Sequence, residues 1–220
     1  MPRSTVHLLR HGEVFNPDKV LYGRIPGYGL SPLGFEMADR AGEYFEAKAA
    51  QGAKIVRLVA SPLIRAQQTA QPTAQALDLP VLTDDRVIEA GNKFEGLSRV
   101  SKRLRNPRLW PLLRNPLQPS WGEPYAQQVA RMREAMDEHR RLALEAGGDG
   151  AETIIVSHQL PIWVTRRSAE GQRLWHDPRK RECTLTSVTS FEFDGDQLVS
   201  VSYDEPSRDL LAGAANIPGA

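Results

Sequence analysis

A short apolar run near the N-terminus constrains the fold more than any other stretch, because it delivers two basic side chains into a turn. Residues 6–9 predict a buried strand, and Arg10, His11 and Gly12 follow directly. An arginine beside a neutral imidazole suits a phosphoryl group, since the guanidinium can hold two oxygens while a ring nitrogen attacks phosphorus. An Arg-His pair at a strand end is more commonly an ordinary polar contact, so other segments must supply the remaining parts of a site.

Further apolar runs alternate with helical patterns along the chain. Strands are predicted over 54–60, 79–82, 152–157, 184–193 and 197–203, the last two as a hairpin, and helices over 32–50, from Ser61-Pro62, over 125–146 and from Pro161. Ser31 and Ser61, each followed by proline, are interpreted as helix N-caps. Strands that alternate with helices predict an α/β fold, a three-layer α/β/α sandwich with a mainly parallel central sheet.

Three more candidate site residues come from the ends of predicted strands or the turns after them. Arg65 falls in the first turn of a helix, where free N–H groups attract anions and an arginine is otherwise unfavourable. His158 directly follows the strand over 152–157, whereas Glu89 lies in a turn where an isolated acid is ordinarily solvated. Because strand ends of an open α/β sheet face one crevice, we expect a cluster of Arg10, His11, Arg65, Glu89 and His158. No partners can be identified for His7, His139 and His176, and we assign them no chemistry.

Two irregular segments are candidates for substrate binding. The loop over 14–29 is rich in Gly, Pro, Asn and Asp, and it could carry Asn16 and Arg24 to a substrate, although Arg24 could equally be solvated. Residues 97–124 combine arginines and lysines with leucines, tryptophans and prolines. Two interpretations of residues 97–124 stay open: a lid whose cations face an anionic substrate, or a cap whose apolar side rests on the core.

The composition argues against several classes of protein. A formal net charge of +1 over 220 residues argues against a nucleic-acid binder that works through a general basic surface. No apolar run approaches the ~20 residues of a membrane span, and Met1–Ser4 leave no room for a signal peptide before the first strand. Cys183, the one cysteine, permits no internal disulfide and no thiolate metal cage. We therefore expect a cytoplasmic protein without a nucleic-acid or membrane partner.

Four segments together resemble the histidine phosphatase superfamily, the phosphoglycerate mutase-like or branch-1 group. They are Leu9–Glu13, Ser61–Ala70, Glu89 ahead of Phe94–Gly96, and Val156–His158, and they occur in the family's order. The resemblance implies a phosphoglycerate mutase-like fold. It also implies one histidine phosphatase domain over residues 1–220, with a lid or cap insertion at about 96–124.

The resemblance implies a role for each strand-end residue. His11 would become a phosphohistidine, and Glu89 would protonate the leaving oxygen and then take a proton from water. The phosphoryl oxygens would be bound by Arg10, Arg65 and His158, whose positive charge makes a metal or cofactor unnecessary. Four further residues are candidates for substrate binding: Asn16, Arg24, Arg99 and Gln159.

Departures from the mutase pattern favour hydrolysis over phosphotransfer. Mutases carry Gly-Asn after the second histidine, where this chain has Gln159 and Leu160, and their Glu-Ser pair is Glu123 and Pro124 here. We expect a metal-independent phosphatase of a small phosphorylated metabolite, with a 2,3-bisphosphoglycerate-dependent mutase as the alternative. A non-catalytic phospho-ligand-binding module is a third hypothesis, but it predicts loss of a catalytic side chain. The oligomeric state stays open, with a homodimer as one candidate.

Overall fold

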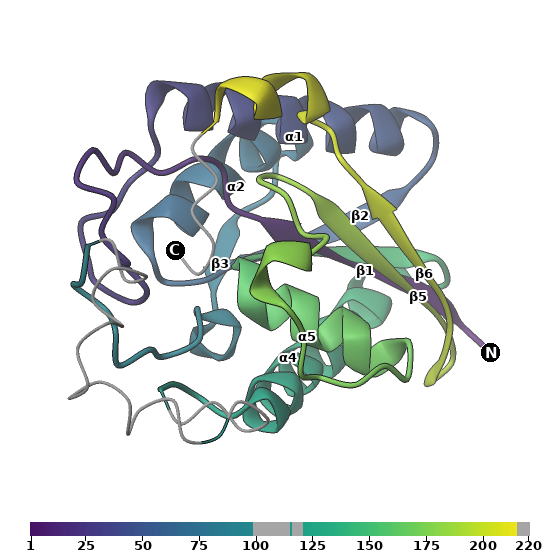
Figure 1. Ribbon diagram of the computed structural model, residues 1–220. Helices are drawn as coiled ribbons and strands as arrows, with labels where there is room; N and C mark the ends of the chain where they lie inside the picture. Colours follow the sequence, from purple (N-terminus) through teal and green to yellow (C-terminus); the bar gives the residue numbers. More distant parts are fainter. Residues whose placement is uncertain (99–114, 116–120, 215–220) are drawn as a thin grey trace.

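The computed structural model describes residues 1–98, 115 and 121–214, in which one mixed sheet lies between two layers of helices (Figure 1). The strand order is β3-β2-β4-β1-β5-β6. Four strands run parallel: β1 (Arg3–Arg10), β2 (Lys54–Ala60), β3 (Val81–Thr83) and β4 (Ala151–Ser157). The remaining two form an antiparallel hairpin beside β1, namely β5 (Val188–Asp194) and β6 (Gln197–Asp204).

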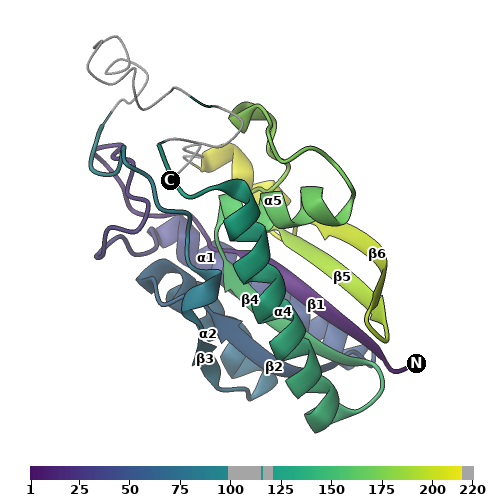
Figure 2. The same cartoon turned by 90° about the horizontal axis from the view of Figure 1, so that it is seen from below.

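Each face of the sheet is covered by two helices, which confirms the predicted α/β fold. The helices are α1 (Pro32–Ala50), α2 (Ile64–Leu77), α4 (Tyr125–Gly147) and α5 (Gln159–Ala169). In Figure 2, α4 lies across the near face of the sheet and α1 lies on the far side.

Alternation along the central strands explains the two helix layers. Leu8 of β1 belongs to the core cluster that includes Met132 of α4 and Ile162 of α5. The next residue, Leu9, belongs to the cluster that includes Phe45 of α1 and residues of α2. Successive side chains of a strand point to opposite faces, so continuous apolar runs are what a sheet buried on both faces requires.

One predicted helix start is confirmed and another is wrong. The Ser31 hydroxyl accepts a hydrogen bond from the Gly34 N–H at 2.9 Å, so Ser31 caps α1 as expected. By contrast, α2 begins at Ile64 with Leu63 as its N-cap, and the Ser61 hydroxyl is used elsewhere. Helix α5 also begins earlier than predicted, at Gln159, because His158 itself is the N-cap residue.

Three short 3₁₀ helices complete the described chain, namely η1 (Asp85–Val87), η3 (Pro178–Lys180) and η4 (Arg208–Gly213). The segment that carries η4 lies along α1 in Figure 1, and the buried Ser207 hydroxyl donates to the Met37 carbonyl at 3.3 Å. None of the helices in these described ranges combines the length and the apolarity that a membrane crossing needs. Most of the segment 97–124, including Arg99, lies outside the described residues, so its interpretation as a lid stays a prediction.

The carboxyl ends of three neighbouring strands stand level at one edge of the sheet. Arg10 pairs with Ser157 across β1 and β4, and Ala60 pairs with Val156 across β2 and β4. The pairing continues one residue beyond β1, where the His11 N–H donates to the Ser157 carbonyl at 3.1 Å. Ligands of open α/β sheets bind at this edge, so the residues that follow these strands define the candidate site.

Candidate active site

The five residues expected to cluster are all buried at this edge. Each of their side chains is at most 4% exposed, and the members are Arg10, His11, Arg65, Glu89 and His158. The rings of His11 and His158 lie with centroids 5.1 Å apart. The Arg65 Nε donates to His11 Nε2 at 3.3 Å, and the charges of Arg65 and Arg10 act on the Glu89 carboxyl. The structure therefore brings these side chains close together, while their catalytic roles stay a prediction.

The hydrogen bonds of His11 determine which ring nitrogen carries the proton. Its Nδ1 lies 2.8 Å from the Gly12 carbonyl oxygen, which can only accept, so Nδ1 carries the hydrogen and Nε2 presents a lone pair. Burial, followed by the charges of Arg65 and Arg10, lowers the pKa of His11 well below 6.5. The ring is therefore neutral at pH 7, with a nitrogen able to attack an electrophile.

Arg65 supplies a buried guanidinium whose hydrogen bonds to described residues go to neutral acceptors. Its Nη2 donates to the Gly23 carbonyl at 2.7 Å, and its plane lies over the Tyr22 ring at 4.7 Å from the centroid. Its buried Nη1 makes no hydrogen bond to any residue that the structure describes. A buried guanidinium N–H is costly to leave unsatisfied, and its position beside His11 Nε2 suits an anionic ligand there.

His158 is held by Ser61 rather than by the helix that it caps. Its Nε2 lies 2.8 Å from the Ser61 hydroxyl, while the buried Nδ1 has no hydrogen-bond partner within the described ranges. Burial and the Arg65 charge lower the pKa of His158 well below 6.5. If Ser61 donates to Nε2, the Nδ1 hydrogen is available to a ligand oxygen. Sequence reasoning missed this contact because a serine before proline is equally typical of a helix start.

The Glu89 carboxyl is suited to carrying a proton. Burial raises its pKa, although the Ala90 N–H at 2.8 Å from Oε1 and the nearby arginine charges oppose that shift. Asp and Glu in such surroundings can act as acids nearer neutrality than exposed carboxyls can.

The four predicted substrate-binding residues have different surroundings. The Asn16 amide closes its own loop through two hydrogen bonds to the Val20 backbone, at 2.8 and 3.0 Å. Arg24 donates from Nε to the Glu89 carbonyl at 2.6 Å, so its guanidinium holds the backbone of the acid. Gln159 is buried, and its Nε2 donates to the Cys183 carbonyl at 3.2 Å. Arg99 lies outside the described residues, and for all four the binding role stays a prediction.

Ion pairs fix the loop that carries Glu89. Arg24 also binds Glu123 at 2.9 Å, and Glu123 accepts two further hydrogen bonds from Arg131, at 2.7 and 3.1 Å. Arg131 in turn donates to the Arg86 carbonyl in η1, just before the loop. Arg131 of α4 therefore holds the segment around Glu89 directly through Arg86 and indirectly through Glu123 and Arg24.

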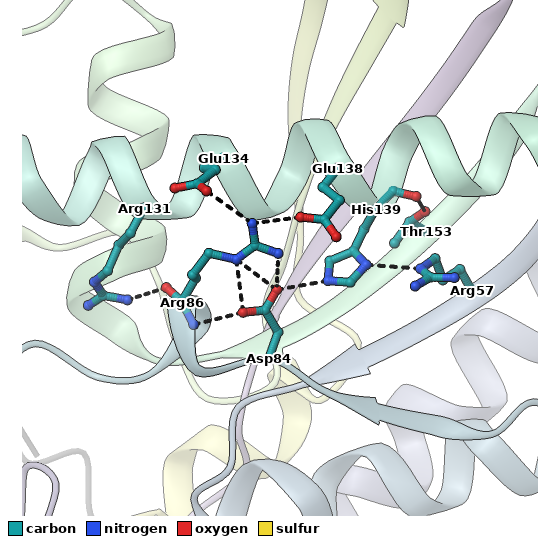
Figure 3. Close-up of polar contacts among 8 residues, drawn as sticks. All are labelled: Arg57, Asp84, Arg86, Arg131, Glu134, Glu138, His139 and Thr153. Atoms are coloured by element: carbon teal, nitrogen blue, oxygen red, sulfur yellow. Dashed lines mark hydrogen bonds and ion pairs between the residues drawn. The ribbon is translucent and has the colours of Figure 1, made fainter.

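A second cluster, drawn in Figure 3, joins η1 to α4 and β2. Asp84 accepts from Arg86 Nη2 at 2.6 Å and from His139 Nε2 at 2.9 Å, while Arg57 donates to His139 Nδ1 at 2.9 Å. Burial alone would raise the pKa of Asp84, but the hydrogen bonds from Arg86 and His139 lower it to about 2.

The sequence shows no partners for His7, His139 and His176, but in the structure all three form hydrogen bonds. His139 bridges Asp84 and Arg57, as described above, and His7 binds Ser190 and Glu152, both at 2.7 Å. His176 lies 2.7 Å from the Leu174 carbonyl and accepts from Arg181 at 2.9 Å. These partners come from segments distant along the chain or from a loop of irregular structure, so no periodic pattern reveals them.

Replacement of Asp84 by asparagine tests the second cluster. The folded-state pKa of about 2 lies below the usual 3.8, so the ion pair stabilises the fold above pH 4 and loses this effect as the pH falls toward 2. We expect Asp84→Asn to lower the free energy of unfolding by about 2 kcal/mol at pH 7, and by progressively less between pH 4 and pH 2. Urea unfolding at both ends of this range measures the effect. Asp209→Asn, on an exposed pair with Arg40, is the control, and an equal loss in both variants would contradict the prediction.

Within the described ranges, no group of three or more His, Cys, Asp or Glu side chains is placed to hold a metal ion. The site combines a neutral imidazole with a hydrogen-free nitrogen, buried cations and a carboxyl with a raised pKa. This combination can accept a phosphoryl group, balance its charge and exchange a proton with it.

Solved structures share this fold. The mycobacterial glucosyl-3-phosphoglycerate phosphatase Rv2419c aligns over 92% of this chain and 98% of its own, with a TM-score of 0.70 and 21% identity. The phosphoserine phosphatase of Entamoeba histolytica, solved with 3-phosphoglyceric acid, aligns over 94% and 100%, with a TM-score of 0.72 and 18% identity. At these identities the likeness concerns the fold.

Sequence comparison identifies the family. The uncharacterized protein Rv0525 of Mycobacterium tuberculosis (strain ATCC 25618 / H37Rv) is 50% identical over 211 residues, which cover 94% of this chain and 99% of that protein. A family model described as histidine phosphatase superfamily (branch 1) matches residues 6–206. The match spans every segment that carries the buried cluster, and the chain belongs to the histidine phosphatase superfamily, branch 1.

Proposed function

We propose that this protein is a metal-independent phosphatase that hydrolyses a small phosphorylated metabolite through a phosphohistidine on His11. The observation that carries the proposal is the His11 tautomer, because the Gly12 carbonyl fixes hydrogen on Nδ1 and leaves Nε2 free to attack. Members of this superfamily bind phosphorylated small molecules. The proposal treats residues 1–220 as one domain with a lid or cap at about 96–124.

The first half-reaction transfers the phosphoryl group to the enzyme. His11 Nε2 attacks phosphorus, the bond from phosphorus to the ester oxygen breaks, and Glu89 gives its proton to the departing alcohol. Arg10, Arg65 and the His158 Nδ1–H bind the three phosphoryl oxygens and balance the charge that develops there. The Arg65 hydrogen bond to His11 Nε2 must break as the phosphoryl group arrives, and the guanidinium then donates to an oxygen instead.

The second half-reaction returns the enzyme to its starting state. The Glu89 carboxylate takes a proton from water, and the water oxygen attacks phosphorus. The bond between phosphorus and His11 Nε2 breaks, which leaves a neutral imidazole and inorganic phosphate. Because Glu89 is buried and its pKa is raised, one carboxyl serves as acid in the first step and as base in the second.

A phosphate-release screen tests this proposal. The protein is incubated with a panel of phosphorylated metabolites and p-nitrophenyl phosphate in the presence of EDTA, and we expect release that the chelator leaves unchanged. A parallel assay supplies 3-phosphoglycerate with 2,3-bisphosphoglycerate. Isomerisation without release would favour a mutase, release that depends on added metal would contradict the mechanism, and inactivity in both assays would favour a binding module.

A further inference from the structure

Glu89 of the buried cluster also lines a pocket. The lining of this pocket includes Glu89, Asn92, Glu123, Tyr125, Leu160 and Arg181. In the proposed mechanism Glu89 protonates the ester oxygen, so the alcohol half of the substrate must lie against this carboxyl. Because Glu89 lines this pocket, the pocket adjoins the position that the alcohol half would take in that mechanism.

Arg181 brings a positive charge to this pocket, and its hydrogen bonds to described residues go to neutral acceptors, although the charge of Glu89 also acts on it. Its Nε donates to His176 Nε2 at 2.9 Å, and its Nη1 donates to Gln159 Oε1 at 3.2 Å. Both acceptors are neutral, because the His176 Nδ1 lies 2.7 Å from the Leu174 carbonyl and burial lowers the pKa of His176 to about 4. No carboxylate that the structure describes lies within 4.0 Å of the Arg181 guanidinium.

Three other buried or partly buried arginines are paired with acids. Arg131 binds Glu123 at 2.7 Å, Arg86 binds Asp84 at 2.6 Å, and Arg140 binds Asp196 at 2.7 Å. Burial lowers the pKa of Arg181, as it does for Arg65 in the phosphoryl site. Removing a guanidinium from water without an anion is costly, and a ligand anion offsets that cost.

The neighbours of Arg181 fix its position. Gln159 holds Nη1 through its amide oxygen, and the same amide donates to the Cys183 carbonyl at 3.2 Å. Arg10 donates to that carbonyl at 2.7 Å. Arg181 is therefore connected through two shared partners to the arginine of the phosphoryl site, so the two cations are held at a fixed spacing.

We propose that Arg181 binds a second anionic group, a carboxylate or a phosphate, on the alcohol half of the substrate. The substrate class is then a phosphomonoester of a negatively charged alcohol, whose carbon skeleton contacts Tyr125 and Leu160. This inference rests on the proposed function, since it requires hydrolysis in which Glu89 faces the leaving oxygen.

Matched esters test the inference. 3-Phosphoglycerate has a carboxylate where glycerol 3-phosphate has a hydroxymethyl group, O-phosphoserine has a carboxylate where O-phosphoethanolamine has hydrogen, and fructose 1,6-bisphosphate has a phosphate where fructose 6-phosphate has a hydroxyl. We expect the wild type to have the higher kcat/KM for the member with the added anionic group in at least one pair. We expect Arg181→Gln to lower that value roughly 10- to 100-fold and to change the value for the member without the added group by less than about threefold. Arg181→Lys should recover part of the preference.

The control and the contrary outcomes are defined by the same assay. Arg179→Gln removes a mostly exposed arginine that is paired with Asp177 at 2.8 Å, and it should leave every ratio unchanged. The inference is overturned if the wild type shows no preference in any pair. It is also overturned if Arg181→Gln slows both members and p-nitrophenyl phosphate equally. If the proposed function itself is wrong, no ester releases phosphate in a reaction that depends on His11. That result is distinct from both outcomes above.

Discussion

Replacing His11 with alanine is expected to lower phosphate release by roughly 10⁴-fold or more, the scale seen when the nucleophile of a covalent mechanism is removed. In the proposed mechanism the His11 Nε2 is the only atom that bonds to phosphorus before water does. The cations that remain can bind a phosphate ester but cannot provide a covalent intermediate. The measurement is the initial rate with p-nitrophenyl phosphate, together with the melting temperature of the variant.

Direct trapping of the intermediate separates this role from a structural one. Rapid denaturation during turnover of a ³²P-labelled ester should leave label on the wild type that is stable in base and lost in acid, as a phosphohistidine requires. His11→Ala should carry no such label. His139→Asn is a matched control, because His139 is also buried but binds Asp84 and Arg57 away from the site; it should lose stability and keep the label. Labelled His11→Ala would disprove the assignment.

The pH dependence of the first step follows from the same environment. Burial and two arginine charges lower the pKa of His11 well below 6.5, so its ring stays neutral as the pH falls from 8 to 6.5. A histidine with an ordinary pKa would be half protonated near pH 6.5 and would lose nucleophilicity there.

Much of the fold follows from local patterns in the sequence. Leu8 and Leu9 belong to a continuous apolar run that predicts a buried strand, and the structure buries them on opposite faces of the sheet. Because Arg10, His11 and His158 lie at the ends of predicted strands, the sequence alone predicts that they meet at one edge of the sheet. Residues within a strand or just beyond it are predictable because their neighbours along the chain determine their position.

Residues that act through distant partners are not predictable in this way. Arg24 appears in a polar loop that suggests a substrate contact, yet its Nε holds the carbonyl of Glu89, 65 residues away in sequence. Arg181 lies in a polar, charged stretch of the sequence, and only the folded chain shows that it donates to the neutral side chains of His176 and Gln159. Ser61 has the signature of a helix cap, and its hydroxyl contacts His158, 97 residues away. Such contacts depend on how the helices and loops pack, which the local pattern does not encode.

Replacing Glu89 with glutamine is expected to slow the two half-reactions to different extents. With an alkyl phosphate, whose alcohol needs a proton to leave, kcat should fall roughly 10²- to 10⁴-fold, the usual contribution of a general acid. p-Nitrophenolate leaves without a proton, so phosphorylation of His11 by p-nitrophenyl phosphate should be much less affected. Hydrolysis of the phosphoenzyme still needs a base, and glutamine cannot supply one.

The expected signature is therefore a burst of p-nitrophenol equal to the enzyme concentration, followed by a slow steady state. Glu138→Gln, at a carboxylate that pairs with Arg86 outside the site, is the control and should show wild-type kinetics. If Glu89→Gln shows no burst, or if its kcat falls equally for alkyl and nitrophenyl esters, the proton transfer belongs to another group.

The pH profile provides a second measure of the same carboxyl. Because burial raises the pKa of Glu89, the acid form persists to a higher pH than an ordinary glutamate allows, and it is lost as the pH rises through the raised value. Wild-type phosphorylation by an alkyl ester should therefore decline on the basic side of that pKa, whereas phosphorylation by p-nitrophenyl phosphate should not. In Glu89→Gln the decline should disappear, because the side chain no longer titrates, and the alkyl ester should react at one slow rate across the range.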